Sequence, residues 1–338
     1  MTSNFSTGNS TLTSKTNVTL DSTLDPGTMS IAVLQGGVSA EREVSLRSGD
    51  NVTKGLRDLG FSVSVYDAAD LSFIEELRSS KPDIVFNALH GRFGEDGTIQ
   101  GLLEILNMPY TGSGVLASAL AMNKQASKDI FIAAGLTTPK GFLMQQGDFS
   151  FAECAQKLGT NCLVVKPNGE GSSVGVSIVN NEADFASGFN DAKDSNHYAL
   201  VEECIPGREI TVGVLEDACG NASALPVIEI IPKTDFYHYE NKYAAGAVSY
   251  VVPAKIDVAA TEKCKELALK AHLALGCHGY SRSDIRLTDD GVAYLLETNT
   301  LPGLTEDSLI PKAVERDGIQ LPELLVRIVK SAYKVDEL

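Results

Sequence analysis

The sequence predicts an α/β protein, and three observations support this fold class. The first half of the chain alternates short apolar runs with longer amphipathic segments, which indicates an open α/β unit. The middle of the chain is rich in short apolar runs typical of strands, and the last part has long β-like runs, one helix and a hairpin. A length of 338 residues suits two or three domains with sizeable cores.

The first unit is expected to contain three strands and two helices. The strands are expected at residues 31–34, 61–66 and 84–89, which are short and apolar, and the helices at 39–59 and 98–106, where apolar residues recur at helical spacing. Glycine-rich turns follow two of these strands, at 35–37 and 90–97. Ligands usually bind at such strand ends in open α/β sheets, so both turns are candidates for a binding site.

The rest of the chain is expected to begin with a helix at 121–134, which Gly135 ends. Short strands follow, and a second long helix and a hairpin come later; these elements are expected at 141–144, 163–166, 176–179, 199–203, 259–275, 281–287 and 292–299. Domain boundaries are placed near residues 122 and 208.

Composition excludes several classes of protein. The net charge of −16 argues against nucleic-acid binding, which needs a basic face. No stretch approaches the roughly 18 apolar residues that a membrane span requires. The six cysteines form no C-x-x-C pair, which argues against a zinc site or a disulfide framework and suits a reducing cytoplasm. Residues 1–28 are rich in Ser, Thr and Asn, so a disordered tail is expected, with Met29 or Met1 as the true start.

The segment KPNGEGSSVG, from Lys166 to Gly175, has the composition of a phosphate-binding loop. It differs from a Walker loop, whose lysine follows the glycines and lies on a helix. Here the lysine ends an apolar run and a second β-like run follows, which predicts a flexible hairpin that closes over phosphates with backbone N–H and hydroxyl donors. An ordinary Gly/Ser-rich turn with no ligand explains the loop equally well on these residues alone.

A second hairpin has the pattern of a metal site. Asp290-Gly291 between two β-like runs predicts a two-residue type I′ turn. That turn places Asp284 opposite Glu297, and Arg282 opposite Asn299, on one face. Facing carboxylates repel unless a cation lies between them, and oxygen ligands suit Mg²⁺. The alternative is a solvated surface hairpin, and a register slip of one residue removes the metal interpretation.

Several segments together resemble the D-alanine–D-alanine ligases of the ATP-grasp superfamily, over about residues 30 to 330. The matching segments occur in the family's order and lie at 36–45, 89–97, 109–114, 166–175, 240–243, 282–284 and 297–305. The resemblance implies an N-terminal α/β substrate domain (29–122) followed by two α+β domains (123–208 and 209–338) that clasp ATP between them. A lid loop is expected at 231–248.

The resemblance also implies a reaction. ATP phosphorylates the carboxylate of one D-alanine, the amine of a second D-alanine attacks the acyl phosphate, and D-alanyl-D-alanine, ADP and phosphate leave. The dipeptide serves peptidoglycan synthesis. Two Mg²⁺ ions, for which Mn²⁺ can substitute, and basic side chains offset the repulsion between the anions, with Glu297 expected to bridge the two ions. A cytoplasmic homodimer whose only ligands are D-alanine, ATP and the metal is expected.

Site roles follow from the matched positions. The metal ligands are expected to be Asp284, Glu297 and Asn299. ATP is expected to contact Lys124, Lys166, Gly171, Ser172, Ser173, Glu202, Cys204, Ile205, Glu209 and Lys242, with Glu202 accepting from the adenine amine. The catalytic set is expected to be Glu41, Ser172, Tyr243, Arg282 and Gly303, with Arg282 and the Gly303 N–H stabilising negative charge. The D-alanines are expected to meet Glu41, His90, Ser308 and Leu309.

Two other functions compete with this interpretation. A D-alanine–D-lactate ligase shares the ATP site; the Lys242-Tyr243 pair favours the dipeptide enzyme, while His238 in the lid keeps the depsipeptide enzyme open. A non-catalytic ATP-binding protein needs fewer of the charged residues found here. A Rossmann dehydrogenase is excluded, because residues 35–40 do not form G-x-G-x-x-G.

Overall fold

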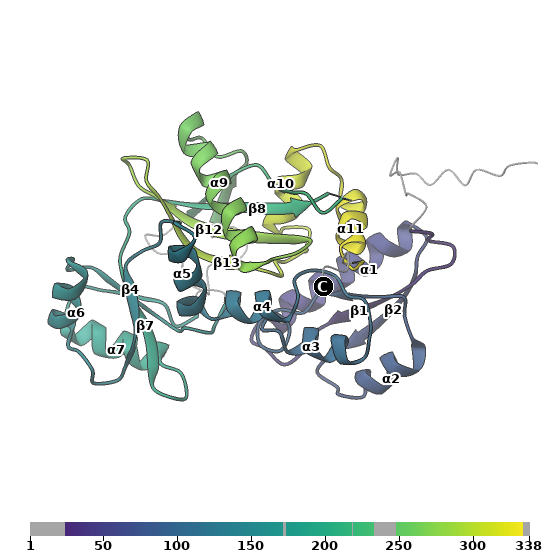
Figure 1. Cartoon of the computed structure of the whole chain (residues 1–338), viewed down its shortest axis with the longest axis horizontal. Helices are drawn as coiled ribbons and strands as arrows, with labels where there is room; N and C mark the ends of the chain where they lie inside the picture. Colours follow the sequence, from purple (N-terminus) through teal and green to yellow (C-terminus); the bar gives the residue numbers. More distant parts are fainter. Residues whose placement is uncertain (1–23, 172–173, 218, 233–247, 334–338) are drawn as a thin grey trace, which may run out of the picture.

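The computed structural model of the chain describes residues 24–171, 174–217, 219–232 and 248–333. Within these residues the chain forms three β-sheets, each accompanied by its own helices (Figure 1). This arrangement confirms the predicted α/β class. No helix in these ranges combines the length and apolar character that crossing a membrane requires.

The N-terminal sheet is parallel, with strand order β2-β1-β3. Its strands and helices are β1 (Ser30–Gln35), α1 (Arg42–Asp58), β2 (Ser62–Asp67), α2 (Phe73–Ser80), β3 (Ile84–Asn87) and α3 (Thr98–Ile105). The first helix begins at Arg42, three residues later than predicted, because the Ser39 hydroxyl donates to the His90 carbonyl at 2.6 Å. That turn joins the ends of β1 and β3.

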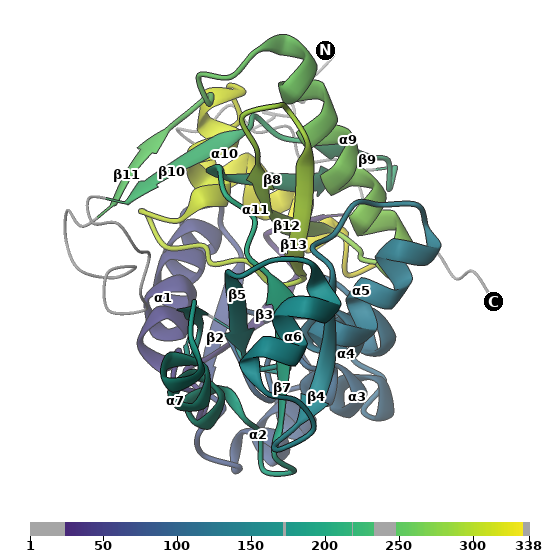
Figure 2. The same ribbon diagram turned by 90° about the vertical axis from the view of Figure 1, so that its left-hand side faces the viewer.

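The central sheet is antiparallel, with order β4-β7-β5-β6. Its elements are β4 (Gly141–Gln145), α6 (Phe151–Leu158), β5 (Leu163–Lys166), β6 (Ser177–Val179), α7 (Glu182–Ala192) and β7 (Tyr198–Glu203). Helices α6 and α7 lie on the outer side of this sheet, toward the viewer in Figure 2. Neither helix was predicted, although Ser150 and Glu153 form a capping box and Asn181 caps α7, both of which are sequence signals for a helix start.

The helix predicted at 121–134 is confirmed by α5, but it starts three residues later than predicted, because the chain breaks at Asn123. Two helices, α4 (Val115–Met122) and α5 (Lys124–Ala133), meet there. Asn123 has an extended backbone, and its side chain accepts a hydrogen bond from the Ala126 N–H at 3.0 Å, so it caps α5. The second helix thus starts afresh with Lys124 in its first turn.

The C-terminal sheet has the path β11-β10-β8-β12-β13, with β9 paired to β8. Its strands are β8 (Arg208–Glu216), β9 (Ala222–Ala224), β10 (Ile228–Pro232), β11 (Val248–Val251), β12 (Tyr280–Leu287) and β13 (Ala293–Asn299), and α9 (Val258–Leu275) packs on it. The chain then returns to the N-terminal sheet through α10 (Leu309–Arg316) and α11 (Leu321–Lys330).

One hydrophobic core joins the first and last parts of the chain. It includes side chains from β1, α1, β3, α10 and α11. Helix α11 lies close to α1 at Gly55, where an added Cβ atom meets Leu325 Cδ1 at 2.4 Å. A larger residue at position 55 therefore requires the end of the Leu325 side chain to move, and this close contact packs α1 against α11.

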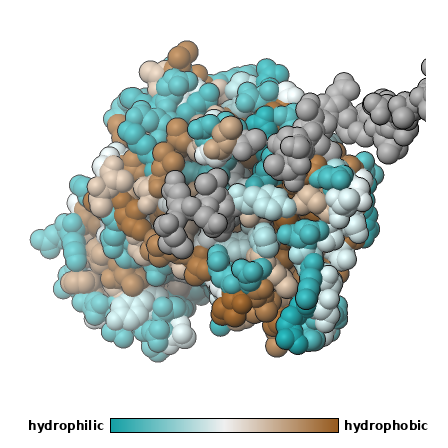
Figure 3. All heavy atoms as spheres, turned by 45° about the vertical axis from the view of Figure 1, so that its right-hand side comes forward, coloured by the Kyte–Doolittle hydropathy of each residue, from teal (hydrophilic) through white to brown (hydrophobic). Residues whose placement is uncertain are grey.

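The surface drawn in Figure 3 mixes hydrophilic side chains with smaller apolar areas. Exposed large apolar residues are scattered over several elements, among them Leu71, Ile105 and Leu116. Single apolar side chains scattered in this way are normal on a protein surface.

A buried carboxylate, Glu216, ties β8 to α9 and to the segment before β12. It lies 3.3 Å from His272 Nε2 and 2.9 Å from His278 Nδ1, and the Gly279 N–H donates to it at 2.7 Å. Burial opposes the charge on Glu216, but these hydrogen bonds outweigh burial and lower its pKa to about 2. Glu216 therefore stabilises the fold at pH values above its ordinary pKa of 4.5, and this stabilisation fades as the pH falls toward 2.

We expect Glu216→Gln to destabilise the protein at pH 7 by about 2–4 kcal/mol, given roughly 1.4 kcal/mol per pKa unit. The difference in melting temperature between wild type and variant should shrink when the pH is lowered from 7 to 3. Differential scanning calorimetry at both pH values measures this, with the exposed Glu266→Gln as a control. An equal difference at both pH values contradicts the assignment.

Candidate active site

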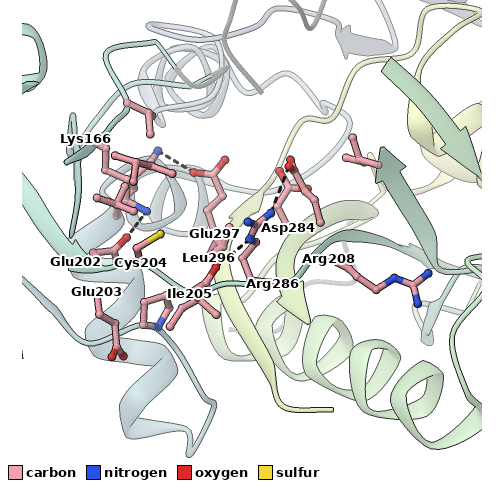
Figure 4. A pocket seen from close by; sticks show the side chains of 18 of the residues that line it. Lys166, Glu202, Glu203, Cys204, Ile205, Arg208, Asp284, Arg286, Leu296 and Glu297 are labelled. Carbon is pink, nitrogen blue, oxygen red and sulfur yellow. Dashed lines mark hydrogen bonds and ion pairs between the residues drawn. The ribbon is translucent and has the colours of Figure 1, made fainter. Parts of the chain in front are cut away.

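A cavity of about 470 Å³ lies between the central and C-terminal sheets. Figure 4 shows Lys166, Glu202, Cys204 and Ile205 on one side of it and Asp284, Leu296 and Glu297 on the other. Its volume falls within the usual range for a small-molecule site. The two walls come from different sheets, so a ligand here contacts both units at once.

Two lysines and one glutamate form a buried charged cluster in the central wall. Lys166, at the end of β5, lies 2.5 Å from Glu202 Oε2 on β7. Lys128, on α5, donates to Glu202 Oε1 and, at 2.6 Å, to the carbonyl of Pro139. Burial opposes the charge on Glu202, but the two lysines outweigh burial and lower its pKa, so this carboxylate is ionised. The wall thus presents an ammonium group, Lys166, to the cavity.

The opposite wall is the predicted metal hairpin, and its pairing is confirmed. Asp284 lies opposite Glu297, and Arg282 lies opposite Asn299. The predicted two-residue turn is wrong, however. Thr288 and Val292 pair with each other, so three residues, 289–291, form the loop, with Gly291 at φ +77°.

A β-bulge restores the expected register. Nearer the loop Ile285 pairs with Leu295, whereas one step further Asp284 pairs with Glu297. Leu296 is therefore the extra residue on β13. In a regular strand consecutive side chains point to opposite faces, yet both Leu296 and Glu297 line the cavity. The bulge thus supplies an apolar contact and a carboxylate from adjacent positions.

Each carboxylate of this hairpin has a cationic partner. Arg282 binds Asp284 through two hydrogen bonds of 3.0 Å, and the Thr211 hydroxyl donates to Asp284 at 2.7 Å. Lys124 Nζ lies 3.0 Å from Glu297 Oε2 and donates to the carbonyl of Glu170 at 2.7 Å. Lys124 therefore connects the hairpin to the start of the glycine-rich loop.

The hinge between the two walls is also in the cavity. Cys204 and Ile205 follow β7 directly and line the cavity together with Glu209. Arg286 holds this connection, because its Nε donates to the Ile205 carbonyl at 3.3 Å and its Nη1 lies 3.7 Å from Glu209. Burial, followed by contact with Cys162, raises the pKa of the Cys204 thiol to about 11, so Cys204 is not a nucleophile at neutral pH.

Glu41 and the glycine-rich loop meet, although they come from different sheets. A Cβ atom added at Gly171 lies 3.1 Å from Glu41 Oε2, and one added at Gly91 lies 2.9 Å from the same oxygen. Both loops approach this carboxylate closely because the two glycines lack side chains. Glu41 thus stands where the N-terminal turns reach the glycine-rich loop beside the cavity.

His90 lies next to the other predicted substrate residues. Its ring contacts Glu95 and Ser48, each at 3.2 Å, and it is buried. A Cβ atom added at Gly303 lies 3.8 Å from His90 Nε2 and 3.0 Å from Ser308 Oγ. Ser308 precedes α10, whose first residue is Leu309, and its hydroxyl accepts from the Thr305 N–H at 2.9 Å rather than from the helix. The structure thus brings the predicted catalytic glycine and both subsites together.

Four predicted residues, Ser172, Ser173, Lys242 and Tyr243, lie outside the described residues, as do His238 and most of the predicted lid. Several residues of the site were missed, among them Lys128, Arg286 and Leu296. Lys128 had a signal, since it lies four residues after Lys124 on α5 and so shares its face. Leu296 had none, because a bulge cannot be read from alternation.

These features define the class of the protein. Two α+β units that enclose a cavity, with lysines on one wall and a carboxylate pair on the other, form an ATP-grasp ligase. The chain is similar to a solved D-alanine–D-alanine ligase from Bacillus anthracis complexed with ATP, with a TM-score of 0.77 and 32% identity, covering 90% of this chain and 97% of that one. A ligase from Coxiella burnetii gives a TM-score of 0.74 at 28% identity, covering 89% and 95% of the two chains.

Sequence comparisons identify the family. Family models for the D-Ala–D-Ala ligase N-terminus and C-terminus match residues 67–113 and 130–330. A D-alanine–D-alanine ligase of Geotalea uraniireducens is 46% identical over 306 residues, which cover 90% of this chain and 96% of the relative. One from Synechococcus sp. is 43% identical over 314 residues, covering 92% and 95%. The chain belongs to the D-alanine–D-alanine ligase family.

Proposed function

We propose that this chain joins two D-alanine molecules into D-alanyl-D-alanine for peptidoglycan synthesis, with ATP converted to ADP and phosphate. The observation that carries this proposal is the cavity, which has lysines on one wall and the carboxylates of the hairpin on the other. A nucleotide placed between them meets cations for its phosphates on one side and oxygen ligands for a metal on the other. Family membership supplies the substrate.

The hairpin fits Mg²⁺ by its donor chemistry. Asp284, Glu297 and Asn299 offer only oxygen ligands, and the first two face each other. The described residues contain no metal site made of three or more His, Cys, Asp or Glu side chains. The hairpin set differs from such a site because its third ligand is the amide oxygen of Asn299. A site with two carboxylates suits Mg²⁺, which usually completes its shell with water and substrate phosphates. When bound there, the ion neutralises charge on the transferred phosphoryl group.

The basic residues are proposed to exchange partners when ATP binds. Lys124 contacts Glu297, and Lys166 contacts Glu202. Both lysines then turn to the phosphates, joined by N–H donors of the loop that contains Gly171, Ser172 and Ser173 and by Lys242 from the lid. The hinge carries the adenine and ribose, through Glu202, Cys204, Ile205 and Glu209. Because each lysine already stands at the cavity wall, the exchange needs only side-chain rotation.

The acyl transfer is proposed to take place between Glu41 and Arg282. Glu41 holds the ammonium group of the first D-alanine, and His90 lines this subsite. Ser308 and the Leu309 N–H at the start of α10 hold the carboxylate of the second, since a helix start favours an anion. Arg282 and the Gly303 N–H stabilise the oxyanion that forms when the second amine attacks. Tyr243, with Ser172 and Glu41, closes the site.

Phosphate release from ATP tests the function. We expect release that depends on D-alanine and Mg²⁺, with no release for L-alanine, and a dipeptide joined by an amide bond. Release that requires D-lactate together with D-alanine, with an ester product, assigns the depsipeptide activity instead. If correctly folded protein binds ATP but releases no phosphate with any of these substrates, the chain is a binding protein and the proposal fails.

Location and assembly belong to the same proposal. The six cysteines are free thiols, which supports a reducing cytoplasm. A homodimer is proposed from family membership, and sedimentation equilibrium measures it directly.

A further inference from the structure

Lys128 is buried behind the cavity and belongs to none of the roles above. The residue is 1% exposed, whereas Lys166 and Glu202 both line the cavity. It donates to Glu202 and to the Pro139 carbonyl, so both of its contacts lie inside the protein. Because Lys128 cannot reach a ligand in the cavity, its charge acts on a group of the protein. The ionised group that it contacts is the carboxylate of Glu202.

The cluster contains two cations and one anion. Lys166 contacts Glu202 Oε2, and Lys128 contacts Oε1. Burial lowers the pKa of Lys128, and the attraction of Glu202 opposes this. Two further charged groups act on Lys128: Lys166 lowers its pKa, and Glu203, at the end of β7, raises it. One cation is enough to balance Glu202, so the second lysine is free to leave without stranding a buried carboxylate.

We propose that Lys128 is a positioning residue that keeps Glu202 ionised while Lys166 turns from it to the phosphates of ATP. This inference rests on the proposed function, in which Lys166 binds phosphate. Without Lys128, the departure of Lys166 leaves a carboxylate that is 2% exposed with no cation. A buried carboxylate without a cation takes up a proton. Binding of ATP to such a variant is then coupled to the uptake of one proton.

The test is proton uptake on ATP binding. Isothermal titration calorimetry at pH 8, with Mg²⁺ and without D-alanine, in buffers of different ionisation enthalpy, counts the protons taken up. We expect about zero for wild type and for Lys128→Arg, and about one for Lys128→Met, by proton linkage. The affinity of Lys128→Met for ATP should fall by up to about tenfold per pH unit above neutrality, while that of wild type stays nearly constant.

Two controls separate this role from simple support of the fold. Adenosine has no phosphate to attract Lys166, so its binding to Lys128→Met should take up no proton. The double variant Lys128→Met/Glu202→Gln has no carboxyl group to protonate, so its ATP binding should lose both the uptake and the pH dependence. A variant that only destabilises the fold lowers the affinity for ATP and for adenosine alike. It changes neither the proton uptake nor the pH dependence of ATP binding.

The outcomes decide between the two proposals. If wild type does not bind ATP, the proposed function fails and this inference fails with it. If wild type binds ATP and Lys128→Met takes up no proton, only the inference is overturned. If Lys128→Met does not fold, the wild-type protein still tests the inference. Uptake of about one proton by wild type on ATP binding shows that Lys128 does not hold Glu202 ionised.

Discussion

Replacing Glu297 with glutamine is expected to lower D-alanine-dependent phosphate release by at least about 100-fold at limiting Mg²⁺, since even residues that only support metal ligands cost 10- to 100-fold. Glutamine keeps the shape of the side chain but removes the charge that faces Asp284 and contacts Lys124. The measurement is the rate as a function of Mg²⁺ concentration. Partial recovery at high Mg²⁺ is expected, because the remaining ligands still bind the ion weakly.

The control for this variant lies on the same hairpin. Asp290→Asn removes a carboxylate from the exposed loop, away from the cavity, and should leave both the rate and its Mg²⁺ dependence unchanged. If Glu297→Gln has a rate within about threefold of wild type at limiting Mg²⁺, the hairpin is not the metal site, and the solvated-hairpin interpretation is correct.

Replacing Arg282 with methionine is expected to lower kcat by about 10²–10³, the effect of removing one donor to a developing oxyanion. The KM for ATP should change only a few-fold, because the nucleotide does not depend on this side chain. Arg282→Lys keeps the charge but cannot make two parallel hydrogen bonds to Asp284, so it should recover part of kcat. Steady-state kinetics with each substrate varied separates these effects.

A matched arginine on the surface provides the control. Arg327 on α11 forms a bridge of 2.6 Å with Glu323, and Arg327→Met should keep full activity. If Arg282→Met instead raises the KM for ATP and leaves kcat unchanged, Arg282 binds nucleotide and does not stabilise the oxyanion.

The metal hairpin shows how far sequence reasoning reached. Asp-Gly between two β-like runs correctly predicts a hairpin, and Asp284 does face Glu297. Yet the loop has three residues and not two, which alone shifts the register by one and turns Glu297 away. The bulge at Leu296 shifts it back. The correct pairing thus results from two deviations that cancel, and neither is visible in local propensity.

The helices show a different limit. The sequence contains the capping box at Ser150 and the cap at Asn181. The helices that they start, α6 and α7, were nevertheless not predicted, because the neighbouring short strands dominated the pattern. Asn123, which caps α5, is likewise a residue type that favours a helix start, yet the predicted helix began at residue 121 and α4 was not predicted. A capping residue was thus present at the start of α5, α6 and α7, and it was not used to place the start of these helices.

The sequence by itself determined most of the first unit, with its three strands and the helices α1 and α3 but not α2. It also determined the glycine-rich loop after Lys166, the hairpin carboxylates, and the family to which the motifs point. These depend on interactions between near neighbours in the chain. The tertiary structure decided which charges meet. Lys124 contacts Glu297, and Lys128 contacts Glu202, across elements far apart in sequence. Only burial in the folded protein makes such pairing necessary, because a charge removed from water needs a partner, and the sequence does not record which one it finds.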